Sequence, residues 1–107
     1  EMEGMKKEAG EKAFLPIGST VVVKGSVKKL MVVARAVYAK LEKGEEYFDY
    51  GACTYPEGLM GDNILYFKKE DIAEVVYRGY EDADEERMLA NISLGLERIE
   101  KERKKHC

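Results

Sequence analysis

The spacing of apolar residues changes once along this chain, near Tyr80, and this change constrains the fold more than any other feature. Before Tyr80 the apolar residues come in short runs rich in valine and tyrosine, which favour β-strands. From Asp82 onward they recur every three or four residues, which is the period of one face of an α-helix. The sequence therefore predicts an α+β fold, in which an antiparallel sheet is followed by a C-terminal α-helix.

The strand-like runs can be placed in more detail. They lie at residues 18–24, 29–40, 45–54, 64–67 and 73–79. The second run is apolar on both faces as far as Arg35, which indicates a central strand. Pro16 precedes the first run, so we expect that strand at an edge. Short connections join the first three runs and predict a meander. We expect a curved antiparallel sheet or a small SH3-like β-barrel of about five strands.

The predicted helix has clear signals at both ends. Asp82 is a suitable N-cap, acidic residues fill the first turn and basic residues follow Lys101, so both ends complement the helix dipole. Its apolar stripe consists of Leu89, Ile92, Leu96 and Ile99. This stripe either packs on the sheet or meets a helical partner or a second copy in a homodimer. We expect a flexible N-terminal arm at 1–13, an antiparallel β domain at 14–81, and the helix with a basic tail at 82–107.

Charge and hydropathy exclude several classes of function. The chain has 18 Lys and Arg residues against 21 Asp and Glu, a net charge of −3, whereas nucleic acids and anionic membranes attract clustered positive charge. Its longest apolar run, at residues 30–34, is far shorter than the roughly 20 residues that span a bilayer. The N-terminal residues lack the apolar segment of a signal peptide. We therefore expect a cytoplasmic protein that binds neither nucleic acid nor membrane.

The residues that usually carry catalysis are few and poorly placed. The sole histidine, His106, is next to last in the basic tail. Cys53 lies in a strand-like run and Cys107 ends the sequence, and we expect both thiols to be reduced. Paired carboxylates such as Glu45 and Glu46 lie in hydrophilic stretches, whereas a catalytic pair needs an apolar pocket to shift one pKa. We expect no enzyme activity, cofactor or metal site; an enzyme with an unrecognised site is a remote alternative.

Two features favour protein binding. The chain has seven tyrosines, which bring a large amphipathic contact area to interfaces, and no tryptophan. Residues 55–63 form an irregular stretch with one proline and two glycines, and it carries Leu59 and Met60. The tyrosines either close the core or form a contact surface, and the Leu59–Met60 pair either anchors in a partner or folds back over the sheet. The partner-binding candidates are Tyr47, Tyr50, Tyr55, Leu59, Met60, Tyr66 and Tyr80.

Several motifs together resemble a known family. They are Phe14-Leu15-Pro16-Ile17-Gly18-Ser19, Lys24-Gly25, Lys28-Lys29-Leu30-Met31, Asp49-Tyr50, Tyr55-Pro56-Glu57-Gly58, Phe67, Glu70-Asp71-Ile72, Val75-Val76-Tyr77 and Gly79-Tyr80-Glu81-Asp82. This pattern resembles domain of unknown function 4176, a Firmicute family encoded beside LXG polymorphic toxins of the type VII secretion system. The resemblance covers about residues 14–86, and its motifs are structural ones.

The resemblance implies a role in toxin export. It implies a cytoplasmic chaperone or targeting adaptor that binds a cognate LXG toxin before secretion, so the expected partner is a protein. The alternative is an immunity protein that neutralises a cognate toxin. Immunity proteins often concentrate one sign of charge opposite a toxin's active site, whereas both signs are interspersed along the strand-like runs of this chain.

Overall fold

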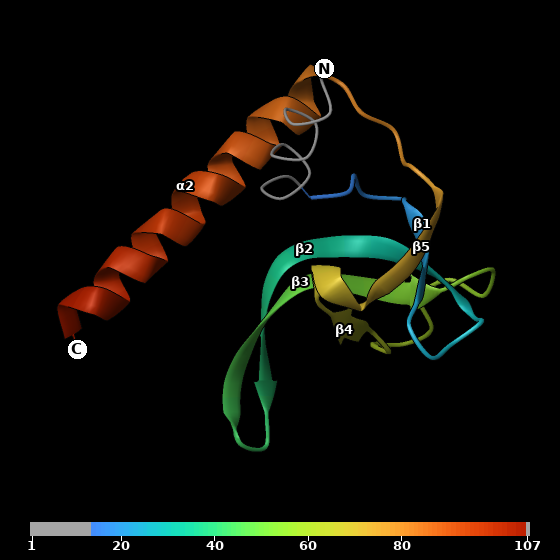
Figure 1. Ribbon diagram of the computed structural model, residues 1–107, viewed down its shortest axis with the longest axis horizontal. Helices are drawn as coiled ribbons and strands as arrows, with labels where there is room; N and C mark the ends of the chain where they lie inside the picture. Colours follow the sequence, from blue (N-terminus) through green and yellow to red (C-terminus); the bar gives the residue numbers. More distant parts are fainter. Residues whose placement is uncertain (1–13, 107) are drawn as a thin grey trace. The chain divides into compact units, whose positions relative to one another are not determined.

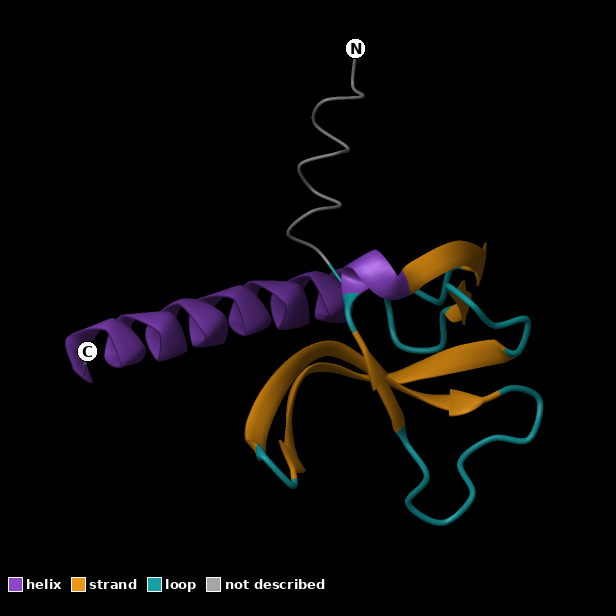
Figure 2. Cartoon of the chain, turned by 60° about the horizontal axis from the view of Figure 1, so that its bottom comes forward, coloured by secondary structure: helices purple, strands orange, loops and turns teal. Residues whose placement is uncertain are grey.

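The computed structural model describes residues 14–106, so the predicted arm at residues 1–13 and the terminal Cys107 lie outside the described residues. Within them, five strands and a short 3-10 turn precede one long helix (Figures 1 and 2). The elements are β1 (Thr20–Val23), β2 (Lys29–Leu41), β3 (Gly44–Thr54), β4 (Leu65–Phe67), η1 (Lys69–Asp71), β5 (Ile72–Tyr77) and α2 (Ala83–His106). The chain forms two compact units: Leu15–Tyr80 contains the whole sheet, and the segment from Glu81 onward contains the helix.

The strands form one open antiparallel sheet in the order β4-β3-β2-β1-β5. The predicted meander of the first three strands is confirmed, and β2 is the central strand, as its apolar character indicated. The expectation of an edge position for β1 was wrong, because β5 returns to pair with it. Pro16 lies before the first strand residue and so leaves the ladder of β1 intact. Of the two expected architectures, the curved sheet is observed and the SH3-like barrel is not, since the sheet stays open with β4 and β5 at its edges.

The long hairpin of β2 and β3 bends midway, and its far end projects beyond the other strands (Figure 1). The pairing register shifts by one residue between Val32 and Ala34, which is a β-bulge that bends the strand. Each strand extends one residue further toward the turn than the predicted runs at 29–40 and 45–54, because Leu41 pairs with Gly44. Gly44 has a φ of 125°, a backbone conformation that side chains rarely adopt, so glycine allows this tight turn.

The core of the sheet unit lies between the middle strands and the chain that enters β1. Its buried apolar side chains include those of Pro16, Val21, Leu30, Val32, Tyr50, Ala52, Cys53 and Phe67. The Tyr50 and Phe67 rings lie 5.5 Å apart between centroids, across the β3–β4 pair. The Tyr50 hydroxyl accepts a hydrogen bond of 2.9 Å from the Leu15 N–H. The core therefore holds the segment before β1 by both packing and a hydrogen bond.

The helix α2 begins where its cap predicts. The Glu85 N–H donates to the Asp82 carboxylate at 3.1 Å, so Asp82 satisfies one of the N–H groups left open in the first turn. Asp84, Glu85 and Glu86 are the acidic residues of that turn. Along the stripe, Leu89 and Leu96 are half-buried, Ile92 is buried and Ile99 is exposed. No helix in the part of the chain that the structure describes combines the length and apolar character needed to cross a membrane.

Candidate interaction surface

The irregular segment between β3 and β4 is held in place by its backbone. The Tyr55 N–H donates to the Lys29 carbonyl at 3.0 Å, and the Gly58 N–H donates to the Thr54 carbonyl at 2.8 Å. Gly58 and Gly61 both have positive φ angles, which glycine adopts without strain. The segment is therefore an ordered platform tied to β2 and β3, and this order limits the entropy cost of binding.

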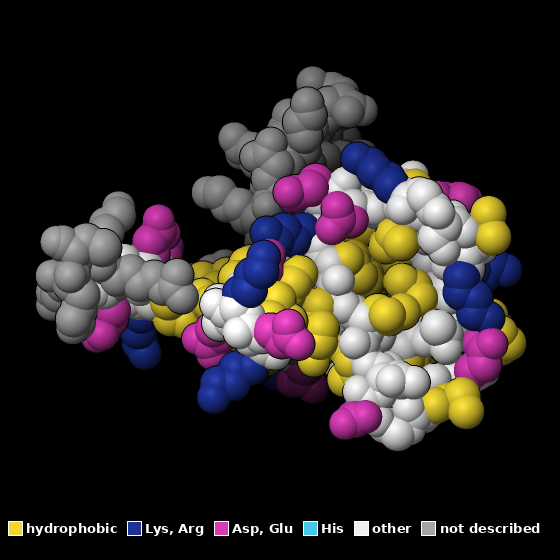
Figure 3. Space-filling model, turned by 90° about the horizontal axis from the view of Figure 1, so that it is seen from below, with side chains coloured by type: hydrophobic (Ala, Val, Ile, Leu, Met, Phe, Trp, Pro, Cys, Tyr) yellow, Lys and Arg dark blue, Asp and Glu magenta, His cyan; other side chains and the backbone are white. Residues whose placement is uncertain are grey.

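This platform presents large apolar side chains to solvent. Met60 is 60% exposed, Leu59 53% and Tyr55 46%. We call Tyr55, Leu59 and Met60 the loop surface. These three sequence-predicted residues belong to one anchored segment, and apolar groups left exposed in this way are typical of protein-binding sites. On the face of the sheet unit in Figure 3, hydrophobic side chains gather in the middle, with Lys, Arg, Asp and Glu around the margin.

An ion pair joins the segment that carries the loop surface to the neighbouring β1–β2 loop. Lys28 Nζ lies 2.8 Å from Glu57 Oε2, and this hydrogen bond holds the pKa of the Glu57 carboxyl below its usual value. Beside Lys28, Val27 is 95% exposed. Sequence reasoning missed Val27, although a single valine between Ser26 and Lys28 in a polar turn was a signal that could have identified it.

The other predicted tyrosines do not join the loop surface into one patch. Tyr50 is 2% exposed and belongs to the core, so its side chain is not available to a partner in this conformation. Tyr47 lies on the projecting hairpin, half-buried against Tyr38 with 5.2 Å between ring centroids. Tyr66 is exposed on β4, and its ring contacts that of Phe48. Tyr80 is largely exposed after β5.

A second group of exposed apolar side chains lies on the edge strand β5. Val75, Val76 and Tyr77 are all exposed, and Tyr77 pairs with Thr20 of β1. The sequence marked this run as a strand, but apolar strand residues are usually half-buried, so nothing in the pattern indicated their exposure. The register between β1 and β5 shifts twice, and such irregularities discourage another strand from adding to an edge.

Titratable side chains gather around Asp49, where β3 meets the turn η1. The Asp49 carboxylate accepts a 2.8 Å hydrogen bond from the Lys69 N–H and another from the Tyr47 hydroxyl. Burial and, to a smaller extent, this hydrogen bond raise the pKa of the Tyr47 phenol well above its usual value. Burial lowers the pKa of the Lys69 ammonium, and the Asp49 charge opposes that shift. Burial likewise raises the pKa of Tyr50. The hydrogen bond from Lys69 to Asp49 holds η1 to β3, which is a structural task.

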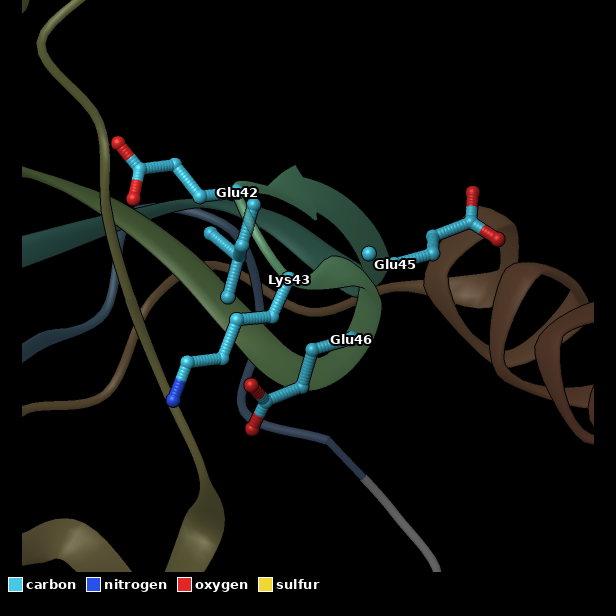
Figure 4. A pocket seen from close by; sticks show the side chains of 6 residues that line it. Glu42, Lys43, Glu45 and Glu46 are labelled. Carbon is cyan, nitrogen blue, oxygen red and sulfur yellow. The ribbon is translucent and has the colours of Figure 1, made fainter.

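A hollow of about 360 Å³ lies at the tip of the β2–β3 hairpin (Figure 4). Its lining consists of six consecutive residues, Leu41, Glu42, Lys43, Gly44, Glu45 and Glu46. Glu45 points away from the other labelled side chains, while Lys43 and Glu46 point to the same side. Among the described residues no group of three or more His, Cys, Asp or Glu side chains is placed to hold a metal ion.

Comparison with known proteins yields one match. A family model described as "Domain of unknown function (DUF4176)" matches residues 14–88, which is most of the chain and includes every strand and the start of α2. No curated protein and no solved structure matches the chain.

Proposed function

The chain belongs to the DUF4176 family, and from that premise we propose that it is a cytoplasmic chaperone or targeting adaptor, which binds a cognate LXG toxin for export by the type VII secretion system. The motifs of the family resemblance include Tyr55-Pro56-Glu57-Gly58, so the resemblance and the loop surface meet in the same segment. The work of such a protein is to bind another polypeptide, which requires exposed apolar side chains on a stable scaffold.

One observation carries this proposal: Tyr55, Leu59 and Met60 are exposed on a segment whose backbone is already anchored to the sheet. Apolar and aromatic groups that enter a partner's pocket dominate the energy of most interfaces, while the residues around them mainly exclude water. The Lys28–Glu57 ion pair lies beside this surface, as part of a charged rim.

The test is co-expression with a candidate cognate LXG toxin, followed by affinity capture and a secretion assay in a deletion strain. The double variant Leu59→Asp/Met60→Asp should reduce toxin capture about tenfold or more and block export, because two charges would then face an apolar pocket. The fold should survive, since both side chains are exposed. The matched control is Leu94→Asp, which changes an equally exposed apolar residue on α2 outside its stripe and should leave capture unchanged.

Two outcomes would contradict the proposal. Normal export in the deletion strain would remove the chaperone role, whatever the chain binds. Rescue of cells from the toxin without any effect on secretion would identify an immunity protein instead.

A further inference from the structure

The far half of the β2–β3 hairpin is a ribbon of only two strands. β1 pairs with β2 only at Lys29, Leu30 and Met31, and β4 pairs with β3 only at Tyr50, Gly51 and Ala52. Residues 37–48, which we call the outer hairpin, therefore have no third strand beside them in the part of the chain that the structure describes. An isolated two-stranded hairpin is marginally stable in water, so this part of the sheet depends on its other contacts.

The boundary of the outer hairpin coincides with a strained residue. Ala36 has a φ of 54°, in the left-handed region that is unfavourable for every residue with a Cβ. It lies between the pairs Arg35–Tyr50 and Val37–Phe48. The β-bulge between Val32 and Ala34 is only a few residues away. Strained backbone of this kind clusters at functional sites, switch regions among them.

Lys68 contacts the outer hairpin at two residues, Glu46 and Phe48. Its Nζ lies 3.5 Å from Glu46 Oε2 and 5.9 Å from the centroid of the Phe48 ring. The Phe48 ring in turn lies 5.6 Å from that of Tyr66. Contacts of these kinds contribute little when they are partly exposed to water, as both members of the ion pair are. By contrast, Asp49 is fixed at the boundary by its hydrogen bond from Lys69.

From this geometry we propose that the outer hairpin opens as a unit about Ala36 while the rest of the sheet stays folded, with Lys68 as the latch that closes it. Opening frees Val37, Tyr47 and Phe48, which are half-buried in the closed state, and so presents additional apolar and aromatic surface. Elements that bind partners are drawn from the least stable parts of a fold, and this hairpin meets that condition. The inference does not depend on the toxin, because opening is a property of the chain alone.

Amide hydrogen exchange of the full chain tests the opening directly. Amides hydrogen-bonded between the strands at residues 38–47 should exchange about tenfold faster, or more, than those at residues 50–52, which lie in the same strand pair but have β4 beside them. Equal protection of the two groups would show that the hairpin opens only with the whole sheet, and would overturn the proposal.

The latch has a matched control. Lys68→Ala removes the contacts to Glu46 and Phe48 and should speed exchange in residues 44–48 about two- to fivefold, with no change at residues 50–52. Lys28→Ala removes the comparable exposed ion pair with Glu57 and should leave exchange in the outer hairpin unchanged. If Lys68→Ala has no effect, or if Lys28→Ala has the same effect, Lys68 is not the latch.

The hinge is tested by two alanine-to-glycine changes in one strand. Ala36→Gly relieves the strain of the closed state, so exchange in the outer hairpin should slow. Ala39, three residues further along, does not have a positive φ, so glycine relieves no strain there. Ala39→Gly removes a buried methyl group, and the amides of the outer hairpin should therefore exchange faster. Faster exchange in both variants would show that Ala36 stores no strain that opening releases.

Discussion

Gly79 is a residue whose missing side chain allows two distant segments to meet. A Cβ at this position would lie 2.5 Å from the Ile17 carbonyl oxygen, closer than real Cβ atoms approach, and 3.0 Å from the Ser19 nitrogen, which is also tight. The Gly79 N–H also donates to Ser19 Oγ at 2.9 Å, between residues 60 positions apart, and Ser19 is fully buried. Both residues belong to the motifs of the family resemblance. Their physical task is to close the end of β5 against the entrance to β1.

The change Gly79→Ala should therefore destabilise the sheet unit by about 2–3 kcal/mol, because backbone atoms must move apart and the buried Ser19 hydroxyl loses its donor. Gly95→Ala is the matched control. No atom lies within 4 Å of a Cβ at Gly95, so this change in the interior of α2 should stabilise the helix by roughly 0.5–1 kcal/mol. Urea denaturation of both variants measures the two effects, and a loss at Gly79 no larger than about 0.5 kcal/mol would contradict the close approach.

Tyr47 makes stability depend on pH in the alkaline range. The pKa of its phenol is raised in the folded state by burial, then by its hydrogen bond to Asp49, whereas in the unfolded chain it titrates near 10. Above pH 10 the unfolded state binds fewer protons than the folded state, so the stabilisation present below pH 10 is lost as the pH rises. Tyr47→Phe should therefore make the free energy of unfolding fall less steeply above pH 10.

The measurement is urea denaturation of wild type and Tyr47→Phe from pH 7 to pH 11. Between pH 7 and 9 the difference in stability between the two proteins should be constant, which provides the internal control. A difference that stays constant up to pH 11 would mean that Tyr47 ionises equally in both states.

At the scale of elements, local signals in the sequence predict most of what is observed. The predicted runs match the five strands to within a few residues, and the helix begins at Ala83 after the Asp82 cap. These features depend on neighbouring residues: β-branched side chains favour extended backbone, and a cap with a 3-4-3 stripe favours a helix. The exposure of β5 was not predictable in this way, because apolar residues in a strand indicate the strand but not its position in the sheet.

The stripe of α2 is the element-scale feature with a direct test. Replacement of Leu89 and Leu96 by Asp should either unfold the domain or dissociate a dimer, because both side chains are partly buried and an unpaired carboxylate is costly there. Thermal unfolding and the mass in solution separate the two results. Replacement of Met88 and Leu94 by Asp, at exposed apolar positions of the same helix outside the stripe, is the control and should change neither. Unchanged stability and mass in the stripe variant would show that the stripe is neither core nor interface.

At the scale of the whole molecule, the candidate surface was predictable only in part. Leu59 and Met60 were identified from the sequence because proline and glycine mark residues 55–63 as irregular, and apolar residues in such a segment have few places to be buried. Tyr50 was grouped with them, yet it lies in the core with its hydroxyl bonded to Leu15. The sequence around a tyrosine does not show whether it lies in the core or on a contact surface. Its ring suits a core, and its hydroxyl needs only one partner there.

The sequence by itself determined the type of each element, the central position of β2, the meander of the first three strands and the cap of the helix, because these follow from periodicity and from contacts between near neighbours. Only the tertiary structure decided that β5 returns to β1, that the sheet stays open, and which tyrosines are buried. These outcomes depend on segments far apart in the chain coming together, such as Val21 with Val75 and Leu15 with Tyr50. Their pairing follows from the packing of the whole sheet, and no local pattern encodes it.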